Sequence, residues 1–164
     1  MSVWKRPIGS TIPSRKGERV DWEALEFGVR AAMLRVGATM METLLNADNG
    51  GYQGPALSCS EDHEMSYHAL RWKEVVTVVG SVRVGRSYYY DALCQQGVCP
   101  KDRLLDIEGT SFSPGVRRLM SRVGASRSFA LAQEDLQDLA GITVHTKDIE
   151  RIAGDEQGEK GARD

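Results

Sequence analysis

A segment of alternating residue types between positions 75 and 90 places a β-hairpin in the middle of a chain whose other periodic segments are helical. Residues 75–79 are mostly β-branched, and Gly80-Ser81 provides a turn. The next residues form two alternating series, as in a strand with two different faces: Val82, Val84, Arg86, Tyr88 and Tyr90 on one face, and Arg83, Gly85, Ser87 and Tyr89 on the other. Tyr67 and Arg71 are predicted to belong to a third strand. A hairpin flanked by helices predicts an α+β fold.

A long amphipathic helix is predicted before the hairpin, over residues 21–45. Asp21 is a good N-cap, and the Asn- and Gly-rich residues 46–51 end the periodic pattern. Apolar residues recur at spacings of three and four on one face: Trp22, Leu25, Val29, Met33, Val36, Met40 and Leu44. We expect this face either to pack on its own domain or to form a homodimer with a second copy, because little chain precedes the helix to cover it.

Three short helices are predicted in the last third of the chain. Ser113-Pro114 supplies an N-cap followed by proline at the first helical position, and Gly124 ends that helix. Two further helices cover residues 128–140 and 146–154. These two helices, joined by residues 141–145, have the order of a helix-turn-helix motif, and a plain three-helix bundle would give the same pattern.

The predicted elements divide the chain into five parts. The parts are a disordered arm over residues 1–20, the amphipathic helix over 21–48, a zinc-ribbon-like β region over 49–108, a helix-turn-helix-like module over 109–156 and a disordered polar tail over 157–164.

The composition is that of a globular chain of one domain or two small ones. The 164 residues are 41% hydrophobic and 27% charged. No apolar run approaches the roughly 18 residues that span a bilayer, and residues 1–14 contain no signal-peptide-like stretch. We therefore expect a cytoplasmic protein with no membrane partner. An odd number of cysteines, three, also argues against a disulfide framework.

The charge of −2 conceals a basic middle segment. Residues 71–127 contain 10 basic and 5 acidic side chains, whereas the segments on either side are net acidic. A local excess of positive charge is compatible with contact to a polyanion such as DNA, and equally with an unevenly charged solvated surface.

Two cysteines bracket the hairpin, Cys59 before it and Cys94 after it. A zinc ribbon joins two tight turns that each supply a pair of ligands. Here each turn has one obvious thiolate. Further ligands could come from Glu61, His63 or His68 near the first turn and from Asp91 or Cys99 near the second, so that a zinc site of Cys59, His63, Asp91 and Cys94 is chemically possible. The alternative is that the cysteines are ordinary thiols in a fold without metal.

The sequence contains no pattern typical of catalysis. It has no glycine-rich phosphate loop, nucleophile elbow or metal-binding histidine pair. We therefore expect a protein that is not an enzyme and has no small-molecule substrate.

The helix-turn-helix-like pattern predicts a set of DNA-binding residues. The N-terminal residues of the second helix of such a motif lie over base edges in the major groove, which assigns Lys147 and Arg151 to base or phosphate contacts. A second basic surface is predicted on solvent-facing positions that would lie along phosphates: Arg117, Arg118, Arg122 and Arg127. Double-stranded DNA is therefore the main expected partner, and a DNA-bound protein would associate with the nucleoid.

Three phrases of the sequence carry a resemblance to a known family. They are TVVGSVRVGRSYYY over residues 77–90, QGVCPKDRLLDIEGTSFSPGVRRLMSRVGA over 96–125 and LAGITVHTKDIERIAGDEQG over 139–158. Together they resemble the N-terminal region of bacterial insertion-sequence transposases of the ISKra type. That resemblance implies a zinc ribbon and a helix-turn-helix region that recognise transposon ends, without the ribonuclease H-like catalytic domain that follows in the family.

The chain departs from that family at the metal site. The resemblance places two further cysteines near positions 61 and 91, where this chain has Glu61 and Asp91. The predicted ribbon is therefore degenerate, with Cys59 and Cys94 retained. The resulting expectation is a non-catalytic DNA-binding fragment, with a protein-interaction module, a non-functional transposase remnant and a divergent metal-dependent enzyme as alternatives.

Overall fold

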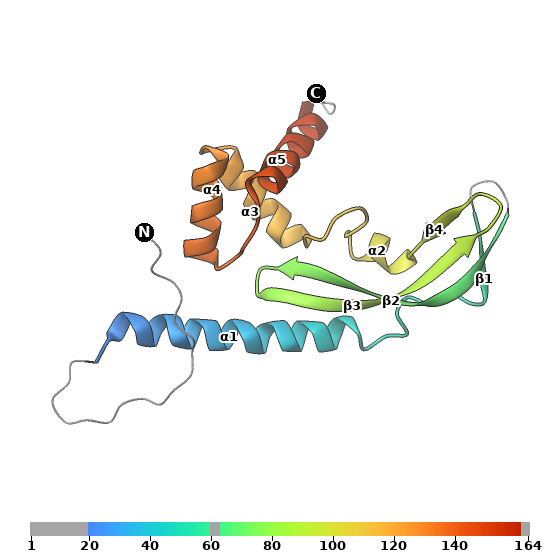
Figure 1. Cartoon of the computed structure of the whole chain (residues 1–164), viewed down its shortest axis with the longest axis horizontal. Coiled ribbons are helices and arrows are strands. Elements are labelled where there is room, and N and C mark those ends of the chain that lie inside the picture. The colour runs from blue at the N-terminus through green and yellow to red at the C-terminus, as the bar shows by residue number, and fades with distance from the viewer. Residues whose placement is uncertain (1–19, 60–62, 162–164) are drawn as a thin grey trace.

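A computed structural model of the chain describes residues 20–59 and 63–161. It contains a four-stranded antiparallel sheet and helices before and after it, which confirms the α+β class (Figure 1). The helices are α1 (Trp22–Leu45), α2 (Pro100–Leu104), α3 (Pro114–Gly124), α4 (Phe129–Asp135), the π-helical segment η1 (Leu136–Ala140) and α5 (Thr146–Gly161). The strands are β1 (Ala56–Ser58), β2 (Glu64–Thr77), β3 (Gly80–Asp91) and β4 (Gln96–Val98).

The two predicted terminal segments lie only partly within the described residues. The arm predicted over residues 1–20 lies, apart from Val20, outside the described residues. The polar tail predicted to start at residue 157 is wrong over its first part, because α5 continues to Gly161. Within the described ranges, no helix is both long and apolar enough to cross a membrane.

The sheet is a meander with strand order β1-β2-β3-β4. The long β2 and β3 form the predicted hairpin, with Val75 opposite Val82 and Thr77 opposite Gly80. Gly80 has a φ of 126°, a backbone conformation that favours glycine over other residues at this turn. The prediction that Tyr67 and Arg71 form a separate strand is wrong, since both belong to β2 together with Val75. One 14-residue strand forms there because the ladder to β3 crosses a local register shift between Tyr67 and Ala69 without ending.

Helix α1 lies along the outer edge of β3 and satisfies its backbone. The Glu42 carboxylate accepts a hydrogen bond from Arg83 N–H at 2.7 Å, and the Gly50 carbonyl accepts one from Ser87 N–H at 2.8 Å. Between these two contacts, the Asn46 side chain donates to the Arg83 carbonyl and accepts from Gly85 N–H. An exposed edge with free N–H and C=O groups is a site of unwanted strand pairing, so these contacts protect the sheet where β4 does not reach.

The face of α1 that packs on the protein is not the predicted apolar face. Ala38, Met41 and Leu45 pack against a small core of hairpin residues that includes Val82 and Val84. The seven residues of the predicted face all remain exposed, by 45% to 70% of their surface. The expectation that this face would pack on its own domain is therefore wrong, because a second apolar stripe on the same helix makes the contact.

The C-terminal helices form a separate hydrophobic core. Val116 and Met120 of α3 are fully buried and pack with Leu136 of η1 and Ile149 of α5. Ser113 caps α3 by accepting a hydrogen bond from Val116 N–H, as its position before Pro114 predicted. Two neighbours of Phe112 join this module to the sheet: Ser111 accepts from Val76 N–H, and Ser113 donates to the Val76 carbonyl.

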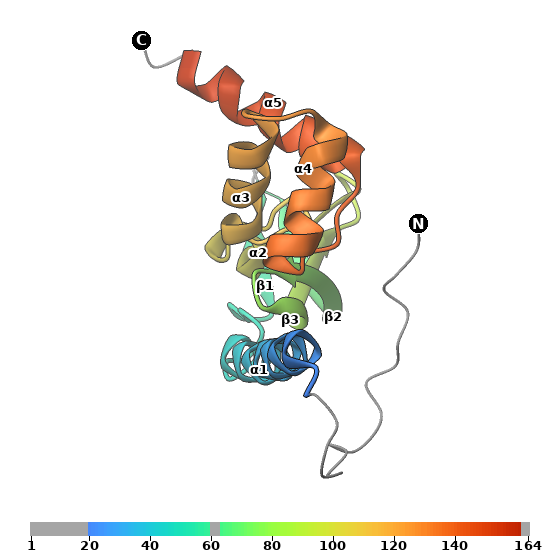
Figure 2. The ribbon, with the colours of Figure 1, turned by 90° about the vertical axis from the view of Figure 1, so that its left-hand side faces the viewer.

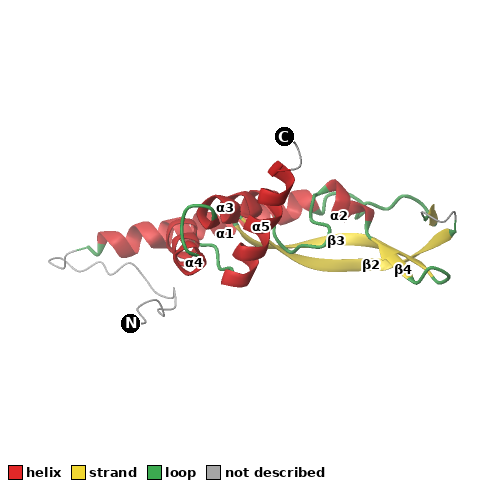
Figure 3. Ribbon diagram, turned by 90° about the horizontal axis from the view of Figure 1, so that it is seen from above, coloured by secondary structure: helices red, strands yellow, loops and turns green. Residues whose placement is uncertain are grey.

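The sheet lies between α1 and the C-terminal module. Figure 2 shows α1 below the hairpin, with α3, α4 and α5 above it. In the view from above, β2 and β3 extend past the helices at one end, and the first half of α1 extends past the sheet at the other (Figure 3). The turns at the free end of the sheet are therefore well separated from the helical module.

Candidate metal centre and basic surface

Two turns meet at the free end of the sheet because a four-stranded meander places its first and third turns at the same end. Cys59 and His63 flank the β1–β2 turn, and Cys59 N–H donates to the His63 carbonyl at 2.9 Å. Asp91 is the last residue of β3 and Cys94 lies in the following β3–β4 turn, which Gln95 helps to close with a positive φ of 53°. Each turn therefore presents two side chains to the other.

The four predicted ligands form one cluster, with one ligand atom of each lying within 4.8 Å of all the others. Cys59 Sγ lies 3.9 Å from Cys94 Sγ, and His63 Nδ1 lies 3.0 Å from the same sulfur. His63 Nδ1 is also 3.6 Å from Asp91 Oδ2. Ligand atoms around a tetrahedral zinc ion are about 3.3–3.8 Å apart, so these spacings are close to those of a metal site.

Asp91 has an arrangement that suits a ligand. Its Oδ1 accepts hydrogen bonds from Leu93 N–H at 2.8 Å and Cys94 N–H at 3.3 Å, which fixes the carboxylate in the turn. Its Oδ2 is buried and has no hydrogen-bond partner among the described residues. A buried carboxylate oxygen without a donor is costly, and a cation bound by the cluster would satisfy it.

The ionisation of the cluster reflects the close approach of its acidic groups. Burial alone would raise the pKa of Asp91, but the Cys94 thiol and the N–H groups of Leu93 and Cys94 outweigh it and lower that pKa. The Asp91 carboxylate, followed by burial and the Cys59 thiol, raises the pKa of Cys94 to about 12. A negative carboxylate beside two thiols is an arrangement that a divalent cation would stabilise. The described residues therefore form a Cys₂HisAsp cluster able to bind a metal ion.

The exposed residues predicted to contact DNA lie on the C-terminal module and differ in whether an acidic side chain contacts them. Lys147, Arg118 and Arg122 are exposed, and no ion pair is found for them within the described ranges. Arg127 and Arg151 are also exposed but contact acidic groups, at 3.2 Å from Asp135 and 3.6 Å from Asp148.

Arg117 does not face solvent as the helical pattern predicted. Its side chain is 23% exposed, and its guanidinium donates to both the carboxylate and the backbone carbonyl of Asp106. Asp106 adopts a positive φ of 52° in the segment that leads from α2 back toward α3. This segment covers Arg117 through tertiary packing, which the local helical pattern could not indicate.

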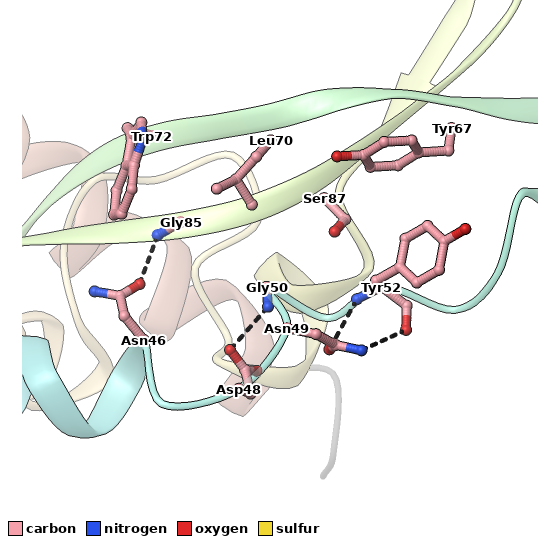
Figure 4. Close-up of a pocket in the computed structure, with 10 residues that line it drawn as sticks. All are labelled: Asn46, Asp48, Asn49, Gly50, Tyr52, Tyr67, Leu70, Trp72, Gly85 and Ser87. Carbon is pink, nitrogen blue, oxygen red and sulfur yellow. Dashed lines mark hydrogen bonds between the residues drawn. The ribbon is translucent and has the colours of Figure 1, made fainter.

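A groove between β2 and the loop after α1 was not predicted. Figure 4 shows Tyr67, Leu70 and Trp72 extending from β2 toward the loop, which places Asn49 and Tyr52 on the facing side. The groove has a volume of about 480 Å³. The alternating positions of Leu70 and Trp72 in the sequence are the signal that would have placed them on one face of β2.

A buried lysine was also missed by sequence reasoning. The Lys101 side chain is 3% exposed, and its Nζ donates to the Leu45 carbonyl and to Asp48 Oδ1, both at 2.6 Å. It thereby satisfies a carbonyl at the C-terminal end of α1. The local sequence around Lys101 contains no signal of these bonds, because the partners Leu45 and Asp48 lie more than 50 positions earlier in the chain.

A scan against protein-family models and a search of curated proteins found no match for this chain.

Proposed function

We propose that the protein binds double-stranded DNA through its C-terminal three-helix module, and that one zinc ion holds the two turns at the free end of its sheet. No catalytic role is assigned to the chain. In this proposal the module recognises DNA and the sheet supplies a rigid support.

The observation that carries the DNA-binding proposal is a pair of exposed basic residues at the start of α5, after a short connection from η1. Gly141 has a φ of 68° and ends the preceding helix, and the buried Ile142 and Val144 anchor the connection. Lys147 and Arg151 then lie exposed, one helical turn apart, at the start of α5. This is the part of a helix-turn-helix motif that enters the major groove.

Exposed arginines on α3 provide a second argument. Arg118 and Arg122 are one helical turn apart and lie on the side of α3 away from the buried Val116 and Met120. Guanidinium groups arranged in this way suit contacts to successive phosphates. The sequence resemblance to the end-recognition region of ISKra-type transposases supports the same assignment, with transposon ends as the DNA sought.

The zinc proposal rests on the donor set and on the orphaned Asp91 oxygen. Cys59, Cys94 and His63 supply the sulfur and nitrogen ligands that zinc prefers in structural sites, and Asp91 supplies an acceptable oxygen. A bound zinc ion would neutralise the acidic groups and link the two turns. The residues would hold the ion in place without an open position for chemistry.

A fluorescence anisotropy titration with labelled double-stranded DNA tests the DNA-binding proposal. We expect the affinity for DNA to fall steeply as the salt concentration rises. At fixed salt, the double substitution Arg118→Glu with Arg122→Glu should lower this affinity at least tenfold. The double substitution Arg35→Glu with Arg103→Glu is a control matched in charge, because both arginines are exposed and lie on α1 and α2, outside the three-helix module. The control should retain wild-type affinity.

Two results would refute the DNA-binding surface. One is undiminished affinity of the Arg118→Glu, Arg122→Glu protein with a wild-type circular dichroism spectrum. The other is binding insensitive to salt, because several phosphate contacts require counterion release.

Elemental analysis of protein purified without added metal or chelator tests the zinc proposal. We expect about one zinc ion per chain. A folded protein without bound metal would refute the zinc site and leave the DNA-binding proposal to be judged by its own titration.

A further inference from the structure

We infer that the exposed apolar face of α1 is the interface of a homodimer. We call this face the α1 stripe; it consists of Trp22, Leu25, Val29, Met33, Val36, Met40 and Leu44. The inference is independent of DNA binding, since none of these residues belongs to the C-terminal module.

The α1 stripe is distinct from the side of the helix that packs on its own chain. On a helical projection its centre lies about 140° from the packed positions Leu34, Ala38, Met41 and Leu45. Those packed positions meet the hairpin core and the segment around Gly141. Burying the α1 stripe would therefore require no change in the contacts that α1 makes within its own chain.

The exposed surface is unusual in extent. The seven side chains are exposed by 45% to 70%, and Trp22, Met33, Met40 and Leu44 each exceed 60%. Together they present on the order of 800 Å², which is what one partner of a standard specific interface buries. Single exposed apolar residues are common, but a continuous stripe of this size marks an interaction site.

The spacing of the α1 stripe favours a second copy as its occupant. The residues recur at intervals of 3, 4 and 4, so that Trp22, Met33 and Leu44 repeat every 11 positions. An 11-residue repeat averages about 3.67 residues per turn, close to a straight helix, and keeps the stripe on one side over the whole length. A second α1 presents the same repeat, so that a two-fold axis near Met33 would match the two stripes along their full lengths.

The position of α1 in the fold allows this pairing. Its first half extends past the sheet, and in Figure 2 the helix forms one border of the molecule. The contact of Arg30 with the Leu139 carbonyl lies on the side that faces the C-terminal module. The α1 stripe is centred about 90° round the helix from Arg30, so a partner helix packed on the stripe would leave this contact in place.

Sedimentation equilibrium of the full chain tests the inference directly. We expect twice the 18.1 kDa mass of the chain at micromolar concentration. The double substitution Met33→Glu with Met40→Glu should raise the dimer dissociation constant about a hundredfold, because it would bury charge in an apolar interface. A matched control, Leu104→Glu with Leu131→Glu, changes two exposed leucines outside α1 and should leave the dimer intact.

A conservative variant separates the interface from folding. Met33→Leu with Met40→Leu keeps the apolar surface and should dimerise like the wild type, and circular dichroism should show unchanged helix content in all variants. A monomeric wild type at 100 µM or above, or a dimer that survives Met33→Glu with Met40→Glu, would overturn the inference. DNA titration of the same variants reports separately on the C-terminal module, so that failure of either proposal is recognised by itself.

Discussion

Asn46 bonds Gly85 as a neighbouring strand would: its Oδ1 accepts a hydrogen bond from Gly85 N–H at 2.8 Å. Its Nδ2 donates to the Arg83 carbonyl at 2.7 Å and to the Glu42 carbonyl at 2.8 Å. One side chain at the end of α1 therefore satisfies both kinds of backbone group on the edge of β3 and closes its own helix.

The substitution Asn46→Ala should destabilise the protein by about 1–3 kcal/mol, because it leaves the partly buried Gly85 N–H unpaired and removes the bonds to the Arg83 and Glu42 carbonyls. Urea denaturation followed by circular dichroism measures the change. Asn49→Ala is the matched control, since Asn49 is exposed and its side chain bonds, among the residues that the structure describes, only the nearby Tyr52 backbone. An equal loss of unfolding free energy in the two variants would contradict the role of Asn46 in stabilising the edge of β3.

The substitution Lys101→Met should lower the free energy of unfolding by about 1–3 kcal/mol. It keeps the apolar stem of the side chain, but the Leu45 carbonyl and the Asp48 carboxylate lose their shared donor. The hydrogen bond from Lys101 lowers the pKa of Asp48 below its ordinary value of 3.8. A carboxyl whose pKa is lowered by folding stabilises the native state above its unfolded pKa, and this contribution disappears as pH falls through the folded pKa.

The stability difference between wild type and Lys101→Met should therefore be largest near neutral pH and shrink below roughly pH 4. Urea denaturation at a series of pH values measures it. A difference that grows on acidification would show that Asp48 is not the acidic partner that matters.

Asp91→Asn should reduce bound zinc below about half an ion per chain, because the amide preserves the Oδ1 acceptor of the turn but removes the anionic ligand atom. Cys59→Ser should do the same, whereas Cys99→Ser should retain the metal, since Cys99 lies outside the four-residue cluster. Elemental analysis reads the stoichiometry. Chelation should also lower the melting temperature of the wild type but leave that of Asp91→Asn nearly unchanged.

Two glycine substitutions should change stability in opposite directions. Gly141→Ala should destabilise the protein by about 1 kcal/mol or more, because the φ of 68° between η1 and α5 disfavours a side chain. Gly154→Ala should stabilise it by up to about 1 kcal/mol, since Gly154 is exposed within α5 and a Cβ there meets no atom within 4 Å. Thermal unfolding compares the two.

The sheet and the candidate metal centre could be predicted to different degrees. The alternation over residues 82–90 and the turn before it located the hairpin, because both are local properties of the chain. The short β1 and β4 were not predicted, since three residues carry too little periodicity to distinguish a strand from a loop. Cys59, His63, Asp91 and Cys94 were identified as chemically suitable ligands, but only the meander topology brings their ligand atoms together.

The sequence by itself determined the boundaries at which a local capping or turn signal acts. Asp21, Ser113 and Gly141 act within a few residues of their own position, by capping a helix or by adopting a backbone conformation that ends one. Tertiary structure alone decided which apolar face of α1 is covered and that Arg117 is bound by Asp106. Those outcomes depend on contacts between segments distant in the chain, whose free energies are set by the shape of the assembled hairpin and helices rather than by local sequence pattern.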